Sequence, residues 1–201
     1  MALVNELALH TRHLGADIHT ALDAAATKPF GFMRFTPGPG VGGHCLPVDP
    51  TYLSWQIRHQ TGGRLRLVEA AAGINASMPA YVVRRLTESL ALRGVPLKNS
   101  RILLLGLAYK PDTADTRDSP TLAIARLLAT EGARLQVADP HVDDSIPYVD
   151  HVPLRAANLA GSDAVVLVTD HTAFDLQLIE QYAPFVLDYR SCLRSANVER
   201  L

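Results

Sequence analysis

The stretch RILLLGLAYKPDTADTRDSPTLAIARLLATEG, residues 101–132, decides the fold class of this chain. It begins with a continuous apolar run at 101–108, which is typical of a strand buried on both faces of a parallel sheet. A polar loop follows, and Asp118 or Ser119 then caps a helix that has Pro120 in its first turn. The stretch therefore predicts strand, loop and helix, the repeating unit of an α/β fold.

The rest of the C-terminal half repeats this alternation. We expect further strands at 134–140, 162–170 and 185–190, with helices at about 155–160 and about 174–182. Strands and helices that alternate in this way favour a Rossmann-like parallel sheet with right-handed crossovers. We therefore expect a Rossmann-like domain at 96–201.

The N-terminal half is helical in pattern. We expect helices at about 2–13, 17–26, 51–60 and 66–93, the last with a kink or restart at Pro79. The segment RGVPLKNS at 93–100 is the expected linker, so an all-helical domain segment should occupy 1–95. The first helix has no N-cap, which suggests that an upstream part of the protein is missing.

The composition indicates an ordinary globular protein, with 48% hydrophobic and 19% charged residues. A formal net charge of −1 gives no electrostatic reason to expect nucleic acid as a partner. No apolar run approaches the roughly 20 residues that span a membrane, and the N-terminus lacks the pattern of a signal peptide. Cys45 and Cys192 are the two cysteines. They are too few for a disulfide framework, so we expect a cytoplasmic protein and a structural role for Cys192.

The segment FTPGPGVGGHCLPVDP, residues 35–50, contains the G-x-G-x-x-G spacing of a dinucleotide-binding loop. That loop works between a buried strand and a helix N-terminus. Here no continuous apolar strand comes before the glycines, and Pro47 and Pro50 prevent a helix directly after them. We therefore do not expect a dinucleotide at this loop.

The loop after the strand at 101–108 is the better candidate for a ligand site, because ligands bind beyond the carboxyl ends of parallel strands. Lys110 and Arg117 in this loop have donors suited to phosphate. The alternative is a solvated loop held together by its aspartates, which are Asp112, Asp115 and Asp118.

A metal site around Cys45 is not expected. His44, Cys45 and Asp49 are residue types that bind metals. However, the sequence contains no further cysteines or histidines paired at the spacing of a zinc site. The other histidines of the second half, His141, His151 and His171, are scattered along the sequence.

A nucleophilic role suits Cys45 better, because it follows glycines that leave backbone N–H groups open to an oxyanion. Gly42 and Gly43 would supply those donors, and a turn could return the carboxylate of Asp49 as a base or to position water. His44 need not be the base, since neighbours in an extended loop point in opposite directions. The alternative is a buried, inert cysteine.

Two separated motifs resemble one known family. PGPGVGGHCLPVDP at 37–50 and GLAYKPDTADTRDSP at 106–120 match the UDP-glucose/GDP-mannose dehydrogenase family in order and spacing. DAAATKPFGF at 23–32 resembles the branch that acts on UDP-N-acetylhexosamines. DPH at 139–141 and SDAVVLVTDH at 162–171 resemble the family's C-terminal domain, so the resemblance extends over nearly the whole chain.

This resemblance implies an enzyme that oxidises the C6 alcohol of a UDP-N-acetylhexosamine to a uronate in two NAD-dependent steps. It makes Cys45 the nucleophile, which holds the aldehyde stage as a thiohemiacetal and then forms a thioester that water cleaves. Asp49 matches the family's aspartate after the cysteine and is implied to assist the water or the proton transfers.

The resemblance also implies contacts with the sugar nucleotide. The nucleotide contacts of the C-terminal domain match Tyr109 and Lys110, whereas Arg117 either contacts substrate or structures the loop through Asp115. Arg34 could reach a phosphate but matches no family residue. The positions that line the sugar and phosphates are Thr36, Gly38, Gly40, Gly42 and Gly43.

The departures from the family limit what this chain can do. The family's N-terminal NAD-binding domain has no match here, and neither does the upstream helix that supplies a lysine and an asparagine near the sugar. We therefore expect a C-terminal portion, inactive on its own, that dimerises through central helices as the family does. Either that dimer core or an intramolecular interface would be formed by Leu67, Val68, Ala71, Ile74, Met78, Val82, Val83 and Leu86.

Two other functions stay open. The chain could be a non-catalytic nucleotide-sugar-binding or dimerisation module derived from the same family. It could also be a thiol hydrolase that uses Cys45 and His44 without NAD.

Overall fold

Strand β1 (Arg101–Leu105) lies inside the sheet that the sequence predicts. The computed structural model describes residues 1–143 and 146–201, and within them six parallel strands pair in the order β3-β2-β1-β4-β5-β6. The other strands are β2 (Arg134–Ala138), β3 (Val149–His151), β4 (Ala164–Leu167), β5 (Val186–Asp188) and β6 (Val198–Arg200). This order is that of a Rossmann-like sheet, with the switch point between β1 and β4.

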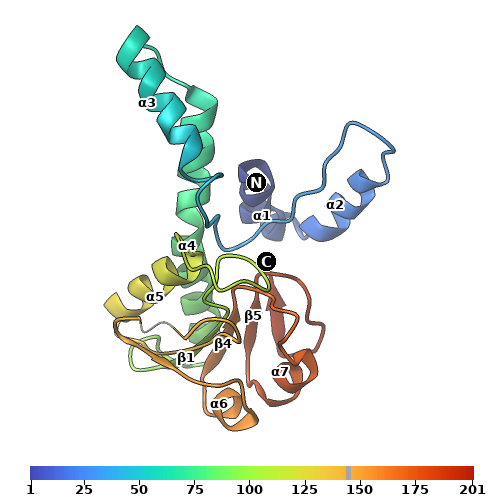
Figure 1. Ribbon diagram of the computed structural model, residues 1–201. Coiled ribbons are helices and arrows are strands. Elements are labelled where there is room, and N and C mark those ends of the chain that lie inside the picture. The colour runs from blue at the N-terminus through green and yellow to red at the C-terminus, as the bar shows by residue number, and fades with distance from the viewer. Residues whose placement is uncertain (144–145) are drawn as a thin grey trace.

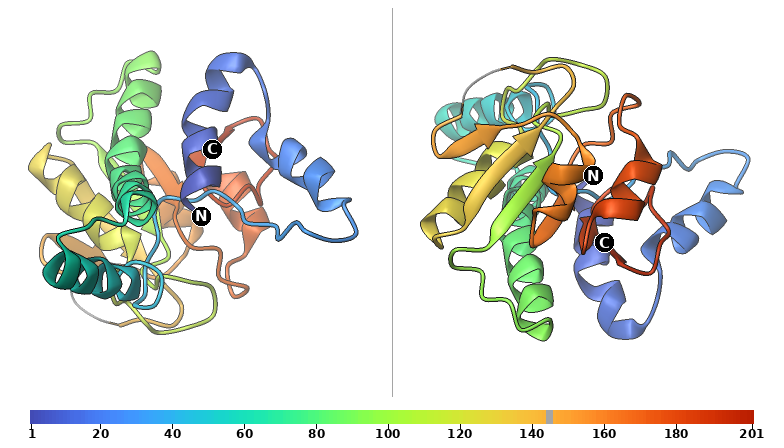
Figure 2. Two further views of the ribbon diagram at one scale, coloured as in Figure 1. Left: turned by 90° about the horizontal axis from the view of Figure 1, so that it is seen from above. Right: turned by 90° about the horizontal axis from the view of Figure 1, so that it is seen from below.

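The two faces of the sheet explain the apolar run of β1. Ile102 and Leu104 belong to the core beneath α4 (Arg66–Leu92) and α5 (Pro120–Thr130). Leu103 and Leu105 belong to the core on the opposite face, beneath α6 (Ala156–Ala160) and α7 (Leu176–Tyr182). Figures 1 and 2 show these helices on either side of the sheet. Because successive side chains of a strand point to opposite faces, a strand covered on both faces has to be apolar throughout.

The expected elements of this half are present with small differences. The predicted strands end earlier than expected, and the residues after each of them form loops. Ser119 is the N-cap of α5, accepting a hydrogen bond from Thr121 N–H, and Pro120 follows it as predicted. Strands β3 and β6 were not expected. They are edge strands of three residues whose side chains are partly exposed, so they carry no apolar run.

The N-terminal part is helical, with α1 (Ala2–Thr11), a short 3-10 turn (Arg12–Leu14), α2 (Ile18–Ala26), α3 (Asp49–Thr61) and α4. In Figure 1, α3 and the first half of α4 form an arm that projects away from the sheet. The expected restart at Pro79 is wrong, because α4 is continuous from 66 to 92 and contains the proline. Helix α3 begins earlier than expected and holds Pro50 in its first turn, where the missing N–H has no partner to lose.

The apolar face of α4 divides at its middle. Met78, Val82 and Leu86 are fully buried in the core of the sheet domain, so this part of the face is an intramolecular interface. In contrast, Leu67 on the arm is 84% exposed. The two chain ends lie near each other, with Leu201 packed against the α1–α2 cluster (Figure 2). In the described part of the chain, none of the helices combines the length and the apolar character needed to cross a membrane.

Candidate functional site

Two loops that lie far apart in the sequence meet beside the carboxyl ends of β1 and β4. One is the glycine loop at 36–43, and the other is the β1–α5 loop at 106–119. The N–H of Gly43 donates a hydrogen bond to the carbonyl oxygen of Arg117 over 2.9 Å. The tertiary structure therefore joins the two segments that the sequence picks out as candidate sites.

The glycines are required by the closeness of this contact. A Cβ on Gly42 would lie 2.5 Å from Tyr109 Cβ and 2.9 Å from the carbonyl oxygen of Asp118. A Cβ on Gly43, whose φ is +77°, would lie 2.9 Å from Tyr109 Cε2. Any larger residue at either position would push the loops apart. Close packing against Tyr109 thus accounts for these two glycines without a bound dinucleotide.

The start of the glycine loop is held by a buried asparagine. Asn5 of α1 is fully buried and accepts a hydrogen bond from Gly38 N–H over 3.0 Å. Its own amide donates to Asn75 Oδ1 of α4 over 2.9 Å. Gly40 packs against Pro120, whose Cγ would lie 3.2 Å from an added Cβ. The loop is therefore anchored to α1, α4 and α5.

Cys45 lies exposed in a turn between this loop and α3. The turn is closed by a hydrogen bond from Val48 N–H to the carbonyl oxygen of His44. Asp49 Oδ1 lies 3.6 Å from His44 Nδ1, and both side chains are more than half exposed. The expectation that Gly43 N–H is open to an oxyanion is wrong, because Arg117 takes that donor. The thiol is open to solvent, as a nucleophile requires.

The basic residues of the β1–α5 loop differ in how they are held. The Nζ of Lys110 is 5.4 Å from the centre of the Tyr109 ring, and the lysine is exposed. Arg117 instead forms a bidentate ion pair with Asp115, in which Nη2 lies 2.6 Å from Oδ2. Hydrogen bonds from the Arg117 side chain and backbone lower the pKa of Asp115 to about 2. Lys110 is thus free to meet a ligand, whereas Arg117 braces its own loop.

Thr36, an expected contact, and Arg34, whose contact with substrate was left open, lie in the segment that leads from α2 into the glycine loop. Thr36 is exposed at the start of the glycine loop. Arg34 binds Asp23 of α2, with Nη2 and Nε of the arginine 2.6 Å and 2.9 Å from the same carboxylate oxygen. In this structure the guanidinium of Arg34 therefore holds the segment after α2.

Arg190, two residues after the end of β5, was not predicted from the sequence as a site residue. Its Nε donates to the carbonyl oxygen of Val168 over 2.6 Å and lies 3.5 Å from Asp170 Oδ1. Its Nη1 would lie 3.3 Å from a Cβ on Gly38, so the guanidinium extends beneath the glycine loop. Burial lowers the pKa of Arg190, and Asp170 opposes that shift. A charged residue at the carboxyl end of a predicted strand was the available signal.

Two clefts lie on the α4 side of the molecule, and one of them adjoins these loops. One of about 520 Å³ lies between the glycine loop, α4 and the start of α5, with Leu46, Asn75 and Asp118 in its lining. Another of about 710 Å³ lies further out between α3 and α4 and is lined by Trp55, Arg58 and others. The first cleft is beside the turn that carries Cys45, since Leu46 and Pro47 of that turn line it. The candidate site therefore comprises the meeting point of the two loops, and this cleft adjoins it on the side of Cys45.

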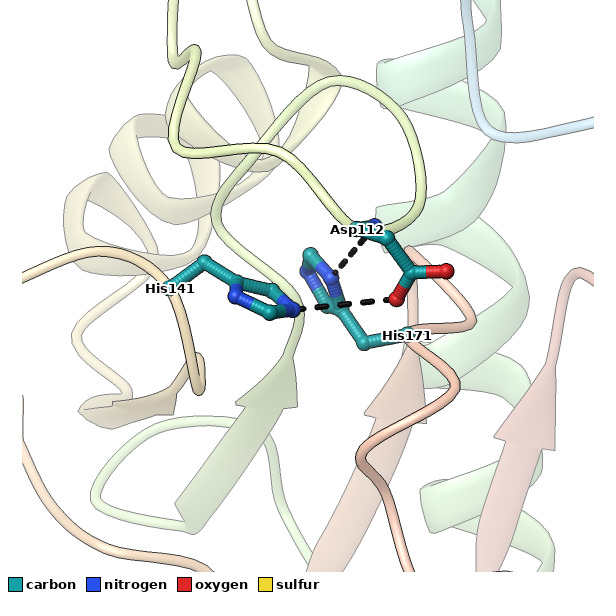
Figure 3. A group of neighbouring side chains, drawn as sticks. All are labelled: Asp112, His141 and His171. Carbon is teal, nitrogen blue, oxygen red and sulfur yellow. Dashed lines mark hydrogen bonds and ion pairs between the residues drawn. The ribbon is translucent and has the colours of Figure 1, made fainter.

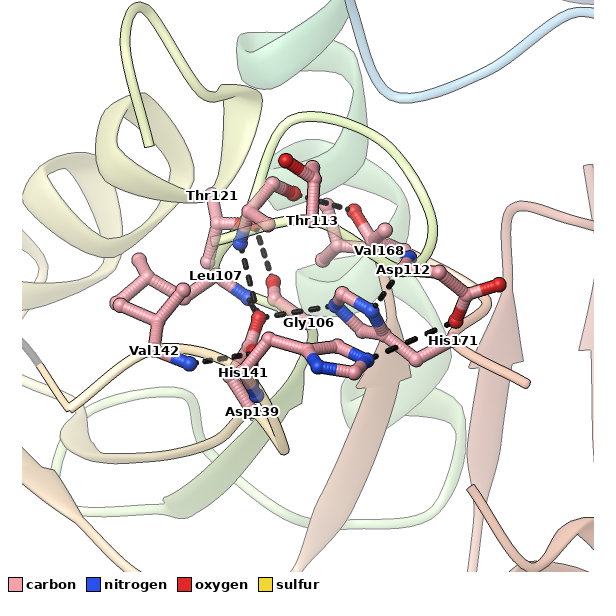
Figure 4. Close-up of polar contacts among 12 residues, drawn as sticks. Gly106, Leu107, Asp112, Thr113, Thr121, Asp139, His141, Val142, Val168 and His171 are labelled. Carbon is pink, nitrogen blue, oxygen red and sulfur yellow. Dashed lines mark hydrogen bonds and ion pairs between the residues drawn. The ribbon is translucent and has the colours of Figure 1, made fainter. Parts of the chain in front are cut away.

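A polar network underlies the β1–α5 loop (Figures 3 and 4). His141 and His171, expected to be scattered, lie together with Asp112, and their possible ligand atoms are within 4.8 Å of one another. However, His171 Nδ1 already accepts the N–H of Asp112, and its Nε2 lies 2.9 Å from Asp139 Oδ2. Since both nitrogens are engaged, His171 has no free lone pair for a metal. Two remaining ligands do not make a metal site.

Asp139 is the centre of this network. Its carboxylate accepts the N–H groups of Leu107, Ala108, His141 and Val142 in addition to its contact with His171. Burial alone would raise the pKa of Asp139, but these hydrogen bonds outweigh it and hold the pKa well below its usual range.

Cys192 has a different environment from Cys45. It is half-buried behind β5, and burial, together with Asp188 and Asp170, raises the pKa of its thiol to about 12. A thiol with so high a pKa is a poor nucleophile at neutral pH, which agrees with the structural role we expect for it.

Comparisons with known proteins agree on one family. Residues 1–77 match the model of the central domain of the UDP-glucose/GDP-mannose dehydrogenase family, and residues 103–195 match that of its UDP binding domain. Over 87% of its length, the chain is 36% identical to a UDP-N-acetyl-D-mannosamine dehydrogenase of Pyrococcus horikoshii. It is 34% identical, again over 87%, to a UDP-N-acetyl-D-glucosamine 6-dehydrogenase of Pseudomonas aeruginosa.

The solved structure of the Pyrococcus horikoshii UDP-D-ManNAc dehydrogenase superposes with a TM-score of 0.79 and 30% identity over 99% of the chain. The chain spans 47% of that structure, and 39% and 41% of the two curated relatives. It therefore corresponds to less than half of each of these relatives.

Proposed function

Because the chain belongs to the UDP-glucose/GDP-mannose dehydrogenase family, we propose that it holds the sugar nucleotide and the nucleophile of a nucleotide-sugar 6-dehydrogenase. The substrate would be a UDP-N-acetylhexosamine, in line with the relatives that it matches. Residues 1–95 would form part of the central helical domain, and residues 96–201 would form the UDP-sugar-binding domain.

One observation carries this proposal. The glycine loop packs on Tyr109 and bonds to Arg117, which places the exposed thiol of Cys45 beside the loop at the switch point of a Rossmann-like sheet. Ligands of such sheets bind at this point. A nucleotide held there would bring its sugar towards Cys45.

The proposed chemistry of Cys45 starts from the aldehyde stage of the sugar. The thiolate forms a C–S bond to C6, and the carbonyl oxygen takes up a proton to give a thiohemiacetal. Loss of a hydride from C6 and of the hydroxyl proton gives a thioester. Water then adds at C6, the C–S bond breaks, and the uronate and the free thiol are released. Asp49, four residues further along, would accept protons from the attacking water.

NAD would supply the hydride acceptor for both oxidations. The glycine loop does not fit this cofactor, because no strand runs into it and its Gly42 and Gly43 backbone is packed against Tyr109. We therefore assign no residue of this chain to NAD and place its site outside these residues.

The proposed nucleotide contacts come from aromatic and basic residues around the meeting point of the two loops. Tyr109 and Lys110 would meet the nucleotide, and Arg190 would meet its phosphates from beneath the glycine loop. Arg117 would act through its pair with Asp115 to hold the loop. The lining of the sugar would come from Thr36, Gly38, Gly40, Gly42 and Gly43.

We also propose a homodimer, in the cytoplasm, that forms through the helical arm. Tyr52, Trp55 and Leu67 on the arm are each more than 60% exposed, although they are large and apolar. A second copy that covered them would remove this surface from water.

Calorimetric titration of the purified chain with UDP and with UDP-N-acetylmannosamine tests the proposal. We expect saturable binding that Lys110→Ala weakens, with about 2.7 kcal/mol of added stability near 100 times the dissociation constant. Lys98→Ala is the matched control, because Lys98 precedes β1 and so lies at the opposite edge of the sheet. A folded chain that binds neither ligand would rule the proposal out.

A further inference from the structure

His171 is a buried histidine that the chemistry proposed for Cys45 does not use. Its side chain is fully buried in the loop after β4, where its ring packs edge to face with the Phe174 ring. It is joined to the β1–α5 loop on one side and to Asp139 on the other. The same loop carries Tyr109 and Lys110.

The partners of His171 define its protonation state. A backbone N–H can only donate, so Nδ1, which faces Asp112 N–H over 3.0 Å, must carry a lone pair. The proton of the neutral ring is then on Nε2, where it is donated to Asp139 Oδ2. Asp139 is held as a carboxylate by its four backbone N–H donors, so it suits this arrangement. The structure thus requires the neutral Nε2–H form.

The β1–α5 loop is shaped to meet this acceptor. Asp112 has a φ of 57°, in the left-handed region that non-glycine residues seldom adopt. Its N–H points at His171, while its Oδ1 accepts both the N–H and the hydroxyl of Thr172, each at 2.9 Å. Three hydrogen bonds therefore connect Asp112 with residues 171 and 172. A strained backbone that is held from both sides marks a position whose conformation matters.

We propose that His171 is a positioning residue that holds the loop of Tyr109 and Lys110 in place only while its ring is neutral. A proton on Nδ1 would face the N–H of Asp112, so the hydrogen bond would be lost and the loop released. The consequence for ligand binding rests on the function proposed above, whereas the effect on the loop does not.

Three charged or titratable groups face His171 in the described structure. Asp139 accepts its Nε2 proton, Asp112 lies on the loop side, and the His141 ring is 5.0 Å away between ring centres. The Nε2 of His141 is 3.7 Å from Asp112 Oδ1, so protonated His141 could also act on the loop. A test has to separate these two histidines.

NMR tests the proposal without any ligand. Long-range nitrogen–proton spectra of the ring, recorded over a series of pH values, should show the Nε2–H form wherever the ring is neutral. Hydrogen exchange of the Asp112 amide should be slow there. Its protection factor, which is the intrinsic exchange rate at each pH divided by the observed rate, should fall about tenfold or more once His171 takes up its second proton, because one hydrogen bond is lost. An Nδ1–H form, or protection of the Asp112 amide that does not change with the protonation of His171, would overturn the proposal.

Three variants separate the effect of protonating His171 from that of protonating His141. His171→Gln keeps one donor and one acceptor without titrating, so its Asp112 amide should stay protected across the pH range. In His171→Phe the Asp112 amide should be unprotected at every pH. If this variant does not fold, the glutamine variant and the wild-type titration test the proposal. His141→Gln is the matched control and should keep the wild-type transition. A transition that persists in His171→Gln and disappears in His141→Gln would overturn the proposal.

Titration with UDP at the same pH values then tests whether release of the loop weakens ligand binding. We expect wild-type affinity to fall with the Asp112 transition and His171→Gln affinity to stay constant. If the loop responds and UDP does not bind at any pH, the proposed function fails while the role of His171 in the loop stands. If UDP binds with no link to the loop transition, the positioning role fails.

Discussion

Gly43 and Arg117 share a backbone hydrogen bond of 2.9 Å, which connects the segment before Cys45 to the β1–α5 loop of the Rossmann-like sheet. Because it joins two backbones, it depends on the loop shapes and not on any one side chain. Whatever separates the two loops should therefore weaken ligand binding and the placement of Cys45 together.

Replacing Gly42 with alanine should separate the loops, since the new Cβ would lie 2.5 Å from Tyr109 Cβ. We expect a loss of about 1–3 kcal/mol in the free energy of unfolding, as for overpacking, and weaker UDP binding. Urea unfolding and calorimetry measure both. Gly73→Ala is the matched control in α4, where a Cβ meets nothing within 4 Å. It should stabilise the chain by about 1 kcal/mol. Equal effects from the two variants would contradict the close contact.

Asn5→Ala should loosen the start of the glycine loop, because it leaves both Gly38 N–H and Asn75 Oδ1 without their buried partner. The expected cost is about 1–3 kcal/mol, measured by urea unfolding. Hydrogen exchange at residues 36–43 should also speed up. Asn75→Ala keeps the bond to Gly38, so it should leave that exchange unchanged. The double variant should cost less than the sum of the two.

Asp115 and Arg117 should make stability depend on pH in the acid range. The pKa of Asp115 is lowered to about 2 in the folded chain, from about 3.9 when unfolded. The pair therefore stabilises the fold above about pH 4, and its contribution is lost as the pH falls towards 2. In urea unfolding across this range, Asp115→Asn should be less stable than wild type at pH 6, and the difference should vanish near pH 2. A constant difference would contradict this origin.

The two cysteines should differ in reactivity. Cys45 is exposed, whereas the thiol of Cys192 has its pKa raised to about 12 by burial and by nearby aspartates. Iodoacetamide at about pH 8 should therefore label Cys45 in the folded chain and spare Cys192, as read by mass spectrometry. In urea both should react. Folded Cys45→Ser should take up no label, and labelled Cys192 in that variant would contradict the assignment.

The sequence by itself determined the layers of the fold. Apolar runs such as 102–105 predict strands because a strand covered on both faces cannot carry polar residues, and Ser119 with Pro120 predicts a helix start because capping is local. The edge strands β3 and β6 could not be predicted from such runs, because their exposed faces allow any residue type. The continuity of α4 through Pro79 could not be predicted either, because packing outweighs the cost of one missing hydrogen bond.

The candidate site, too, was determined partly by the sequence and partly by the tertiary structure. Cys45, Lys110 and the glycines stand out in the sequence, because exposed loops between glycines and prolines are where a thiol or an ammonium can meet a ligand. That Gly42 packs on Tyr109, that Arg190 extends beneath Gly38, and that His171 meets Asp112 were decided only by the tertiary structure. These contacts join residues brought together by the order of the parallel strands, and no local preference of the chain encodes which loops will meet.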